Sequence, residues 1–193
     1  MRNWKLIVGL LILAITASGF VTIKSWTAVE ESESKMLIVF YSHTGNARFV
    51  SEHIQALTGA DVFELILVDP YPEDVNATIE RVNQERETGR LPALVGRIDN
   101  FAEYDVIVLG SPNWFGTLSL PVRSFLDSYD LSGKTIVPFI TFGGGGLMNT
   151  ITDLKTLAPH ATILEEFSVS RDDVKNSQPE ITQWLERTGI HNR

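Results

Sequence analysis

Three short apolar runs constrain the fold of this chain more than any other feature. They cover residues 36–41, 106–109 and 135–142, and each is followed by a polar segment that contains glycine. A continuous apolar run of this length is typical of a strand that is covered on both faces. Two further strands are expected, an edge strand over 61–68 and a last strand over 161–169.

Helical patterns separate these strands. Apolar residues recur with helical spacing between 49 and 57, and a polar helix is expected over 74–88. Pro121 opens a short helix, residues 147–157 form another, and Ser177 with Glu180 has the spacing of a capping box for a last helix that ends near Gly189. Alternating strands and helices predict a parallel sheet with helices on both faces.

The first 24 residues have a different character. Residues 6–23 carry no charge and are preceded by Arg2 and Lys5. As a helix this stretch would be about 27 Å long, close to the ~30 Å of a bilayer core. It fits a cleaved secretory signal, or a retained anchor with Trp26 at the membrane interface, and a buried core helix is the third interpretation. Both membrane interpretations place the rest of the chain outside the cytoplasm.

We therefore divide the chain into a signal peptide or membrane anchor over 1–24, a polar tether over 25–35 and one domain over 36–193. The formal net charge is −8, and because residues 1–24 contain three basic and no acidic residues, the remainder carries −11. Such an acidic surface argues against nucleic acid as a partner. The absence of cysteine excludes disulfides, thiolate metal sites and a cysteine nucleophile, and the four histidines lack metal-ligand spacing.

The loop after the first strand has the composition of an anion site. It comprises Ser42, His43, Thr44, Gly45, Asn46 and Ala47, directly before a helix. Hydroxyl groups, backbone N–H groups and the helix dipole together favour a phosphate without any cation. The alternative is an ordinary strand-to-helix turn capped by Ser or Thr. We expect the Arg48 and His43 side chains to be solvated bystanders.

The loops after the next two buried strands suit a flat ligand. The second loop follows Gly110 and comprises Ser111, Pro112, Asn113, Trp114, Phe115, Gly116 and Thr117; the third comprises Phe142, Gly143, Gly144 and Gly145, with Gly146 next. We expect Trp114 to contact a planar ring and Phe115 to pack on the sheet end. Glycines in the third loop let the backbone approach a ligand edge. Neither a P-loop nor a dinucleotide-binding glycine motif is present.

These three loops, in this order and spacing, resemble those of the flavodoxin family over about residues 36–188. The resemblance implies a three-layer α/β/α sandwich whose five-stranded parallel sheet has the order 2-1-3-4-5. It also implies FMN as the cofactor. Ser42, Thr44, Gly45 and Asn46 would hold the phosphate, the second loop would line the ring and ribityl chain, and the third loop would close the other side.

Two positions depart from the family pattern: Ala47 stands where a Thr is usual, and the third loop lacks a Tyr. With the N-terminal segment, the resemblance predicts an FMN redox protein outside the cytoplasmic membrane, either anchored or secreted. Its partner would be a redox protein or a quinone. The alternatives are an NAD(P)H- or quinone-linked FMN oxidoreductase, and a flavodoxin-shaped interaction module without FMN.

Overall fold

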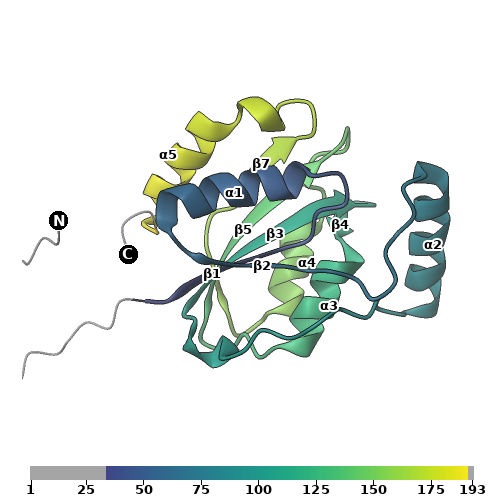
Figure 1. Cartoon of the computed structure of the whole chain (residues 1–193), viewed down its shortest axis with the longest axis horizontal. Helices are drawn as coiled ribbons and strands as arrows, with labels where there is room; N and C mark the ends of the chain where they lie inside the picture. The colour runs from purple at the N-terminus through teal and green to yellow at the C-terminus, as the bar shows by residue number, and fades with distance from the viewer. Residues whose placement is uncertain (1–33, 191–193) are drawn as a thin grey trace, which may run out of the picture. The chain divides into compact units, whose positions relative to one another are not determined.

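The computed structural model describes residues 34–190 (Figure 1). The predicted signal or anchor over 1–24 and the tether up to residue 33 lie outside them. Within 34–190, every helix is too short or too polar to cross a bilayer. The helices and strands in chain order are β1 (Met36–Phe40), α1 (Asn46–Thr58), β2 (Asp61–Glu64), α2 (Val75–Thr88), β3 (Val106–Trp114), β4 (Thr117–Leu118), α3 (Leu120–Ser128), β5 (Thr135–Phe142), α4 (Thr150–Leu157), β6 (Thr162–Ile163), β7 (Phe167–Ser170) and α5 (Gln178–Thr188).

The sheet confirms the predicted topology. Its strands run in the order β2-β1-β3-β5-β6, and these pairings are parallel. The short strand β4 pairs only with β3 and is antiparallel to it. With β4 set aside, this is the expected order 2-1-3-4-5, and β2 lies at the edge as predicted.

Two hydrophobic cores lie on the two faces of the sheet, because side chains alternate along each strand. In β1, Leu37 and Val39 belong to one core, which also contains residues of α3 and α4. Ile38 and Phe40 belong to the other core, with residues of α1 and α5. Figure 1 shows the corresponding layers, with α1 and α5 on one side of the sheet and α3 and α4 on the other.

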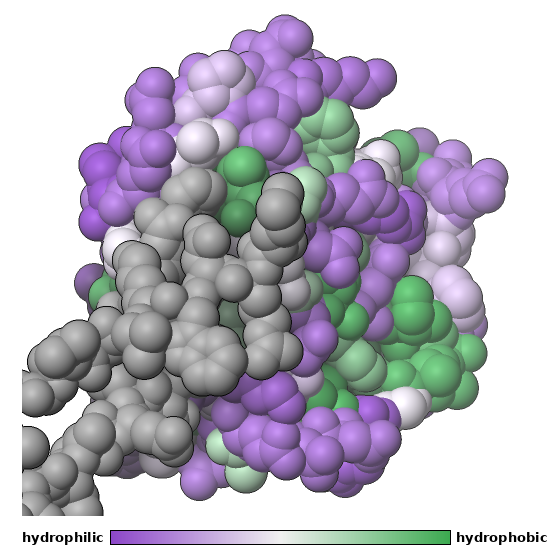
Figure 2. All heavy atoms as spheres, turned by 60° about the vertical axis from the view of Figure 1, so that its left-hand side comes forward, coloured by the Kyte–Doolittle hydropathy of each residue, from purple (hydrophilic) through white to green (hydrophobic). Residues whose placement is uncertain are grey.

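Helix α2 stands apart from these two layers. It lies beyond the carboxyl ends of the strands (Figure 1), and only Thr78, Val82 and Glu85 of its residues are buried. The side chain of Asp74 caps it by accepting a hydrogen bond from the Ala77 N–H at 2.9 Å. Figure 2 shows a surface on which hydrophilic residues predominate and hydrophobic residues form smaller patches between them. This agrees with the acidic composition of the domain.

Several expected boundaries and one expected cap are wrong. Strand β2 ends at Glu64 rather than at residue 68. Helix α4 begins at Thr150 rather than at 147, because Met148 adopts a left-handed φ of 46° that no helix contains. The strand expected over 161–169 is two strands, β6 and β7, with residues 164–166 between them. In this gap the Glu165 carbonyl accepts a hydrogen bond from Trp184 Nε1 at 2.8 Å. The capping box is absent, since the Ser177 hydroxyl donates to the Val174 carbonyl instead.

Candidate functional site

The three predicted loops lie next to one another at one edge of the sheet. They follow β1, β3 and β5, which are neighbouring parallel strands. In sheets of this type, ligands bind outside the carboxyl ends of the strands. The fold therefore assembles the candidate site from loops that are far apart in sequence.

The first loop leads directly into the N-terminus of α1. Gly45 has a φ of 86°, and a Cβ at this position would meet nothing within 4 Å. The first intrahelical bond runs from the Phe49 N–H to the Gly45 carbonyl, and the Arg48 N–H donates to Ser42 Oγ at 3.2 Å. The amides of Asn46 and Ala47 precede these bonds and are the groups a helix N-terminus offers to an anion. Thr44 is exposed beside them.

The Arg48 guanidinium is engaged by Glu64 at the end of β2. The two side chains form a two-point ion pair, with Nη2–Oε1 at 2.5 Å and Nε–Oε2 at 3.2 Å. Arg48 is exposed, as expected, but it is paired with Glu64. This pairing places a carboxylate next to the first loop. The expectation that His43 is solvated is wrong, because its ring is half-buried and packs edge-to-face against Trp114.

Ala47 occupies a buried position. It is 1% exposed and belongs to the core beneath α1 and α5. The family's usual Thr at this position would have to fit two more heavy atoms into that core.

The second loop is not a loop over its whole length. Strand β3 continues to Trp114, beyond the strand end expected at residue 109, and forms a hairpin with β4. Phe115 and Gly116 make the turn with φ values of 55° and 80°, the two left-handed residues of a type I′ hairpin. This backbone turns Phe115 outward, where it is 47% exposed beneath the Arg86 guanidinium, 4.9 Å from the ring centre. The prediction that Phe115 packs on the sheet end is wrong.

Asn113 connects the second loop to the third. Its Nδ2 donates to the carbonyls of Gly146 and Leu147 at 2.6 and 3.0 Å, and its Oδ1 accepts from the Gly116 N–H at 2.9 Å. The Asn149 N–H donates to the Gly116 carbonyl. The Asn113 amide, expected to face a ligand, is thus engaged with the protein backbone.

Two hydroxyl groups of the second loop also bond within the protein. Ser111 is fully buried, and its Oγ accepts from the Ser119 N–H at 3.1 Å, just before α3. Thr117 donates to the Asp153 carboxylate of α4. Pro112 pairs with Thr141 across β3 and β5. Of this segment, the Trp114 and Phe115 side chains remain available to a ligand.

The third loop exposes its backbone. Gly143, Gly144 and Gly145 are exposed, and Phe142 before them is half-buried. Only Gly146 of the four glycines has a positive φ, at 65°. A Cβ on Gly116 would lie 2.9 Å from the Met148 Sδ, so this contact with the third loop depends on glycine.

Trp114 lies in a group of four rings that we call the aromatic cluster: Tyr41, His43, Tyr71 and Trp114. The Trp114 ring centre is 5.1 Å from Tyr71, 5.6 Å from Tyr41 and 5.7 Å from His43, in edge-to-face geometry each time. Burial raises the pKa of the Tyr41 phenol, and burial followed by a hydrogen bond to Glu85 raises that of Tyr71. Both phenols therefore stay protonated. The sequence motifs do not single out Tyr71, which lies between two prolines with no local pattern.

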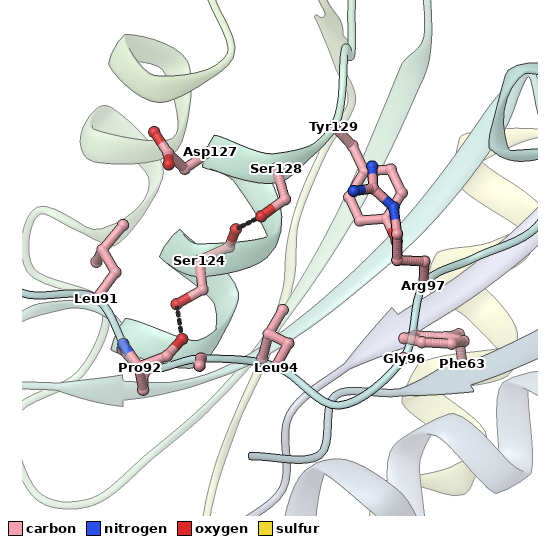
Figure 3. Close-up of a pocket in the computed structure, with 11 residues that line it drawn as sticks. Phe63, Leu91, Pro92, Leu94, Gly96, Arg97, Ser124, Asp127, Ser128 and Tyr129 are labelled. Carbon is pink, nitrogen blue, oxygen red and sulfur yellow. Dashed lines mark hydrogen bonds between the residues drawn. The ribbon is translucent and has the colours of Figure 1, made fainter. Parts of the chain in front are cut away.

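The hollows on the surface lie elsewhere. One of about 360 Å³ is lined by residues 91–97 and the end of α3, where Ser124 donates to the Pro92 carbonyl (Figure 3). Another, of about 680 Å³, adjoins α2. In the part of the chain that the structure describes, three or more His, Asp or Glu side chains nowhere gather as a metal site would require. We place the candidate site at the three loops because they combine a helix N-terminus, an aromatic ring and open backbone.

Comparison with known proteins identifies the family and the fold. The flavodoxin family model matches residues 35–188. The chain belongs to the flavodoxin family. A protein of Bacteroides eggerthii DSM 20697 assigned as a flavoprotein has a crystal structure with a TM-score of 0.71 and 28% identity, over 81% of this chain and 99% of that one.

Two further flavodoxin-like structures share the fold. One is a Bacteroides uniformis ATCC 8492 protein, also assigned as a flavoprotein, with a TM-score of 0.71, 24% identity and coverage of 80% of this chain and 99% of that one. The other is a flavoprotein of Lactobacillus acidophilus NCFM, crystallised in complex with FMN. Its TM-score is 0.63 at 21% identity, over 79% of this chain and 99% of that one.

Proposed function

We propose that this protein binds FMN at the three loops and transfers electrons outside the cytoplasmic membrane. The observation that carries the proposal is the convergence of all three loops at one sheet edge in a chain of the flavodoxin family. The FMN complex of the Lactobacillus acidophilus relative supports the choice of flavin.

The residues present fit the parts of this cofactor. Ser42, Thr44, Gly45 and Asn46 surround the start of α1, where backbone N–H groups favour a phosphate. Trp114 presents an aromatic ring, and residues 143–145 present exposed backbone that can approach a flat ring edge. When bound, FMN supplies one- or two-electron chemistry, and the protein positions it and sets its electrostatic surroundings.

Acidic charge shapes those surroundings. Glu64 lies beside the first loop and Asp153 beside the hairpin, in a domain of strongly negative net charge. Negative charge disfavours an anionic reduced ring and favours association with a basic partner. We propose a redox protein with a basic surface, or a membrane quinone, as the partner.

The proposed location depends on the N-terminal sequence. Arg2 and Lys5 precede the uncharged residues 6–23, which is the arrangement that keeps an N-terminus inside and exports the rest of the chain. A reporter enzyme fused after Arg193 should be active only outside the cytoplasm. Activity inside the cytoplasm would contradict this location without affecting the flavin proposal.

An FMN titration of the full-length protein, followed by flavin fluorescence quenching, tests the central proposal. We expect saturable binding, and Trp114→Ala should weaken it by about 1–3 kcal/mol, the range for aromatic stacking on a flat base. Phe115→Ala, on the same hairpin, measures separately what the second aromatic side chain contributes. Absence of FMN binding by the wild type would refute the proposal and favour an interaction module. NADH oxidation in the presence of quinone would instead identify an oxidoreductase.

A further inference from the structure

We infer that Tyr71, held in place by Glu85 and Arg81 of α2, is a positioning residue that fixes Trp114 for binding of the flavin ring. This inference rests on the proposed function, because it assigns a role within the same site. Tyr71 acts through Trp114 and is not itself placed against the ligand.

Tyr71 is fixed at both ends of its side chain. It is 6% exposed, and its hydroxyl donates to Glu85 Oε2 at 2.5 Å. Its ring lies 4.5 Å below the Arg81 guanidinium and 5.1 Å from the Trp114 ring. Tyr71 therefore joins α2 directly to the end of β3.

Arg81 fixes both Glu85 and the chain that carries Tyr71. Its Nε donates to Glu85 Oε1 at 3.1 Å, and its two terminal nitrogens donate to the carbonyls of Pro70 and Asp69 at 2.9 and 2.8 Å. The residues directly before Tyr71 are thus bonded to the same guanidinium that covers its ring. Rotation of Tyr71 away from Trp114 would break its hydroxyl bond to Glu85 and its ring contact with Arg81.

Burying polar and charged groups in this way stabilises the folded protein less than burying apolar groups would. Glu85 is only 9% exposed, and burying a carboxylate is unfavourable unless it is fully paired. An apolar residue at position 85 would fill the same space without that cost. What the Glu85 carboxylate adds is a directional bond, which gives Tyr71 one orientation and Trp114 one edge-to-face neighbour.

The other edge-to-face contacts of Trp114 come from residues at the first loop, which also contact the Tyr71 ring. Tyr41 and His43, at the start of the first loop, also meet its ring edge-to-face. Tyr71 supplies the contact from β2 and α2, so that the indole is held from two separate parts of the chain. A ring that is already ordered loses less conformational freedom when a ligand binds, which increases affinity.

Tyr104 provides a matched control. It is a buried tyrosine whose hydroxyl donates to the carboxylate of Asp61 at 2.7 Å, like the Tyr71–Glu85 pair. It lies before β3 and next to the start of β2. This is the amino end of the strands, whereas the loops lie at their carboxyl ends. Tyr104→Leu therefore removes an equivalent pair without touching the aromatic cluster.

The test is a titration of the full-length protein, purified in detergent, with FMN and with riboflavin. Tyr71→Leu should raise both dissociation constants by about 10-fold, the upper range for the loss of one edge-to-face aromatic pair. The two constants should rise together, because Tyr71 acts on the ring that contacts the flavin part common to both ligands. Tyr71→Phe keeps the ring but loses the bond to Glu85, so it should weaken both ligands less than Tyr71→Leu does. Tyr104→Leu should leave both constants unchanged.

Trp114 can also be observed directly. With 5-fluorotryptophan incorporated, the ¹⁹F signal that disappears in Trp114→Phe belongs to Trp114. This signal should shift in ligand-free Tyr71→Leu and stay in place in Tyr104→Leu. If Tyr71→Leu does not fold, Glu85→Leu, which removes the acceptor of the tyrosine hydroxyl, should shift the same signal and weaken both ligands.

The outcomes separate the two proposals. Flavin binding that is equally strong in wild type and Tyr71→Leu, or an unmoved Trp114 signal, would overturn the positioning role and leave the proposed function intact. A wild type that binds neither FMN nor riboflavin would overturn the proposed function and, with it, the role assigned to Tyr71.

Discussion

Substitution of Asn113 should loosen the contact between the second and third loops. In Asn113→Ala, the Leu147 carbonyl keeps two other donors, the N–H and the hydroxyl of Thr150. The Gly146 carbonyl and the Gly116 N–H lose their bonds to Asn113. Each of these two neutral hydrogen bonds contributes about 0.5–1.5 kcal/mol, so the free energy of unfolding should fall by about 2 kcal/mol.

Urea unfolding measures the loss of stability, and hydrogen exchange at the Gly116 amide measures the local loosening. The control is Asn76→Ala, at an exposed position of α2, which should not reduce stability. Asn113→Asp should be worse than Asn113→Ala at neutral pH, because it turns a carboxylate oxygen toward two carbonyls, and should recover as the carboxyl group protonates. A loss below about 0.5 kcal/mol with unchanged exchange at Gly116 would refute this account of Asn113.

Three further predictions concern packing and pH. A Cβ in Gly110→Ala would lie 2.6 Å from two ring carbons of the buried Phe139. We therefore expect the free energy of unfolding to fall by at least about 1–3 kcal/mol. In a urea double-mutant cycle, Phe139→Leu should partly restore this stability. Ala47→Thr should lose about 1–3 kcal/mol by overpacking, whereas Ala47→Ser should tighten FMN but not riboflavin in calorimetry. Burial, then the Glu85 bond, raises the pKa of Tyr71, so folded protein keeps this proton where the unfolded chain loses it. Stability in urea should therefore fall as pH rises above ~10, by about 1.4 kcal/mol per pH unit for this group, and Tyr71→Phe should remove that part of the slope.

The sheet could be predicted from the sequence because its signals are local. Residues 36–40 are apolar without interruption, and the structure divides them between two cores, with Leu37 and Ile38 on opposite faces. Such a run is typical of a strand in the middle of a sheet that is covered on both faces. The start of α2 was equally local, since Asp74 caps the helix through its own side chain.

The wrong predictions fall where contacts between residues far apart in the sequence determine the backbone conformation. The left-handed φ of Met148, which delays α4, accompanies its packing against Gly116 on another strand. Ser177 has the right spacing for a cap, but its hydroxyl donates a hydrogen bond to the Val174 carbonyl instead. Tyr71 and Trp114 meet only because α2 folds back over the strand ends, and no periodicity in either segment shows this.

The last two residues of β3 connect the three loops of the site. Asn113 and Trp114 are consecutive residues of an extended strand, so their side chains point to opposite faces. Asn113 reaches the third loop, and Trp114 reaches Tyr41 and His43 at the first. A shift of one residue in the strand would exchange the two directions and lose both contacts. The pairing of Pro112 with Thr141 fixes this register immediately before the two side chains diverge. The parallel pairings of β3 with β1 and with β5 thus determine the relative placement of all three loops. The affinity of the site should depend on these pairings as much as on any residue that touches the ligand.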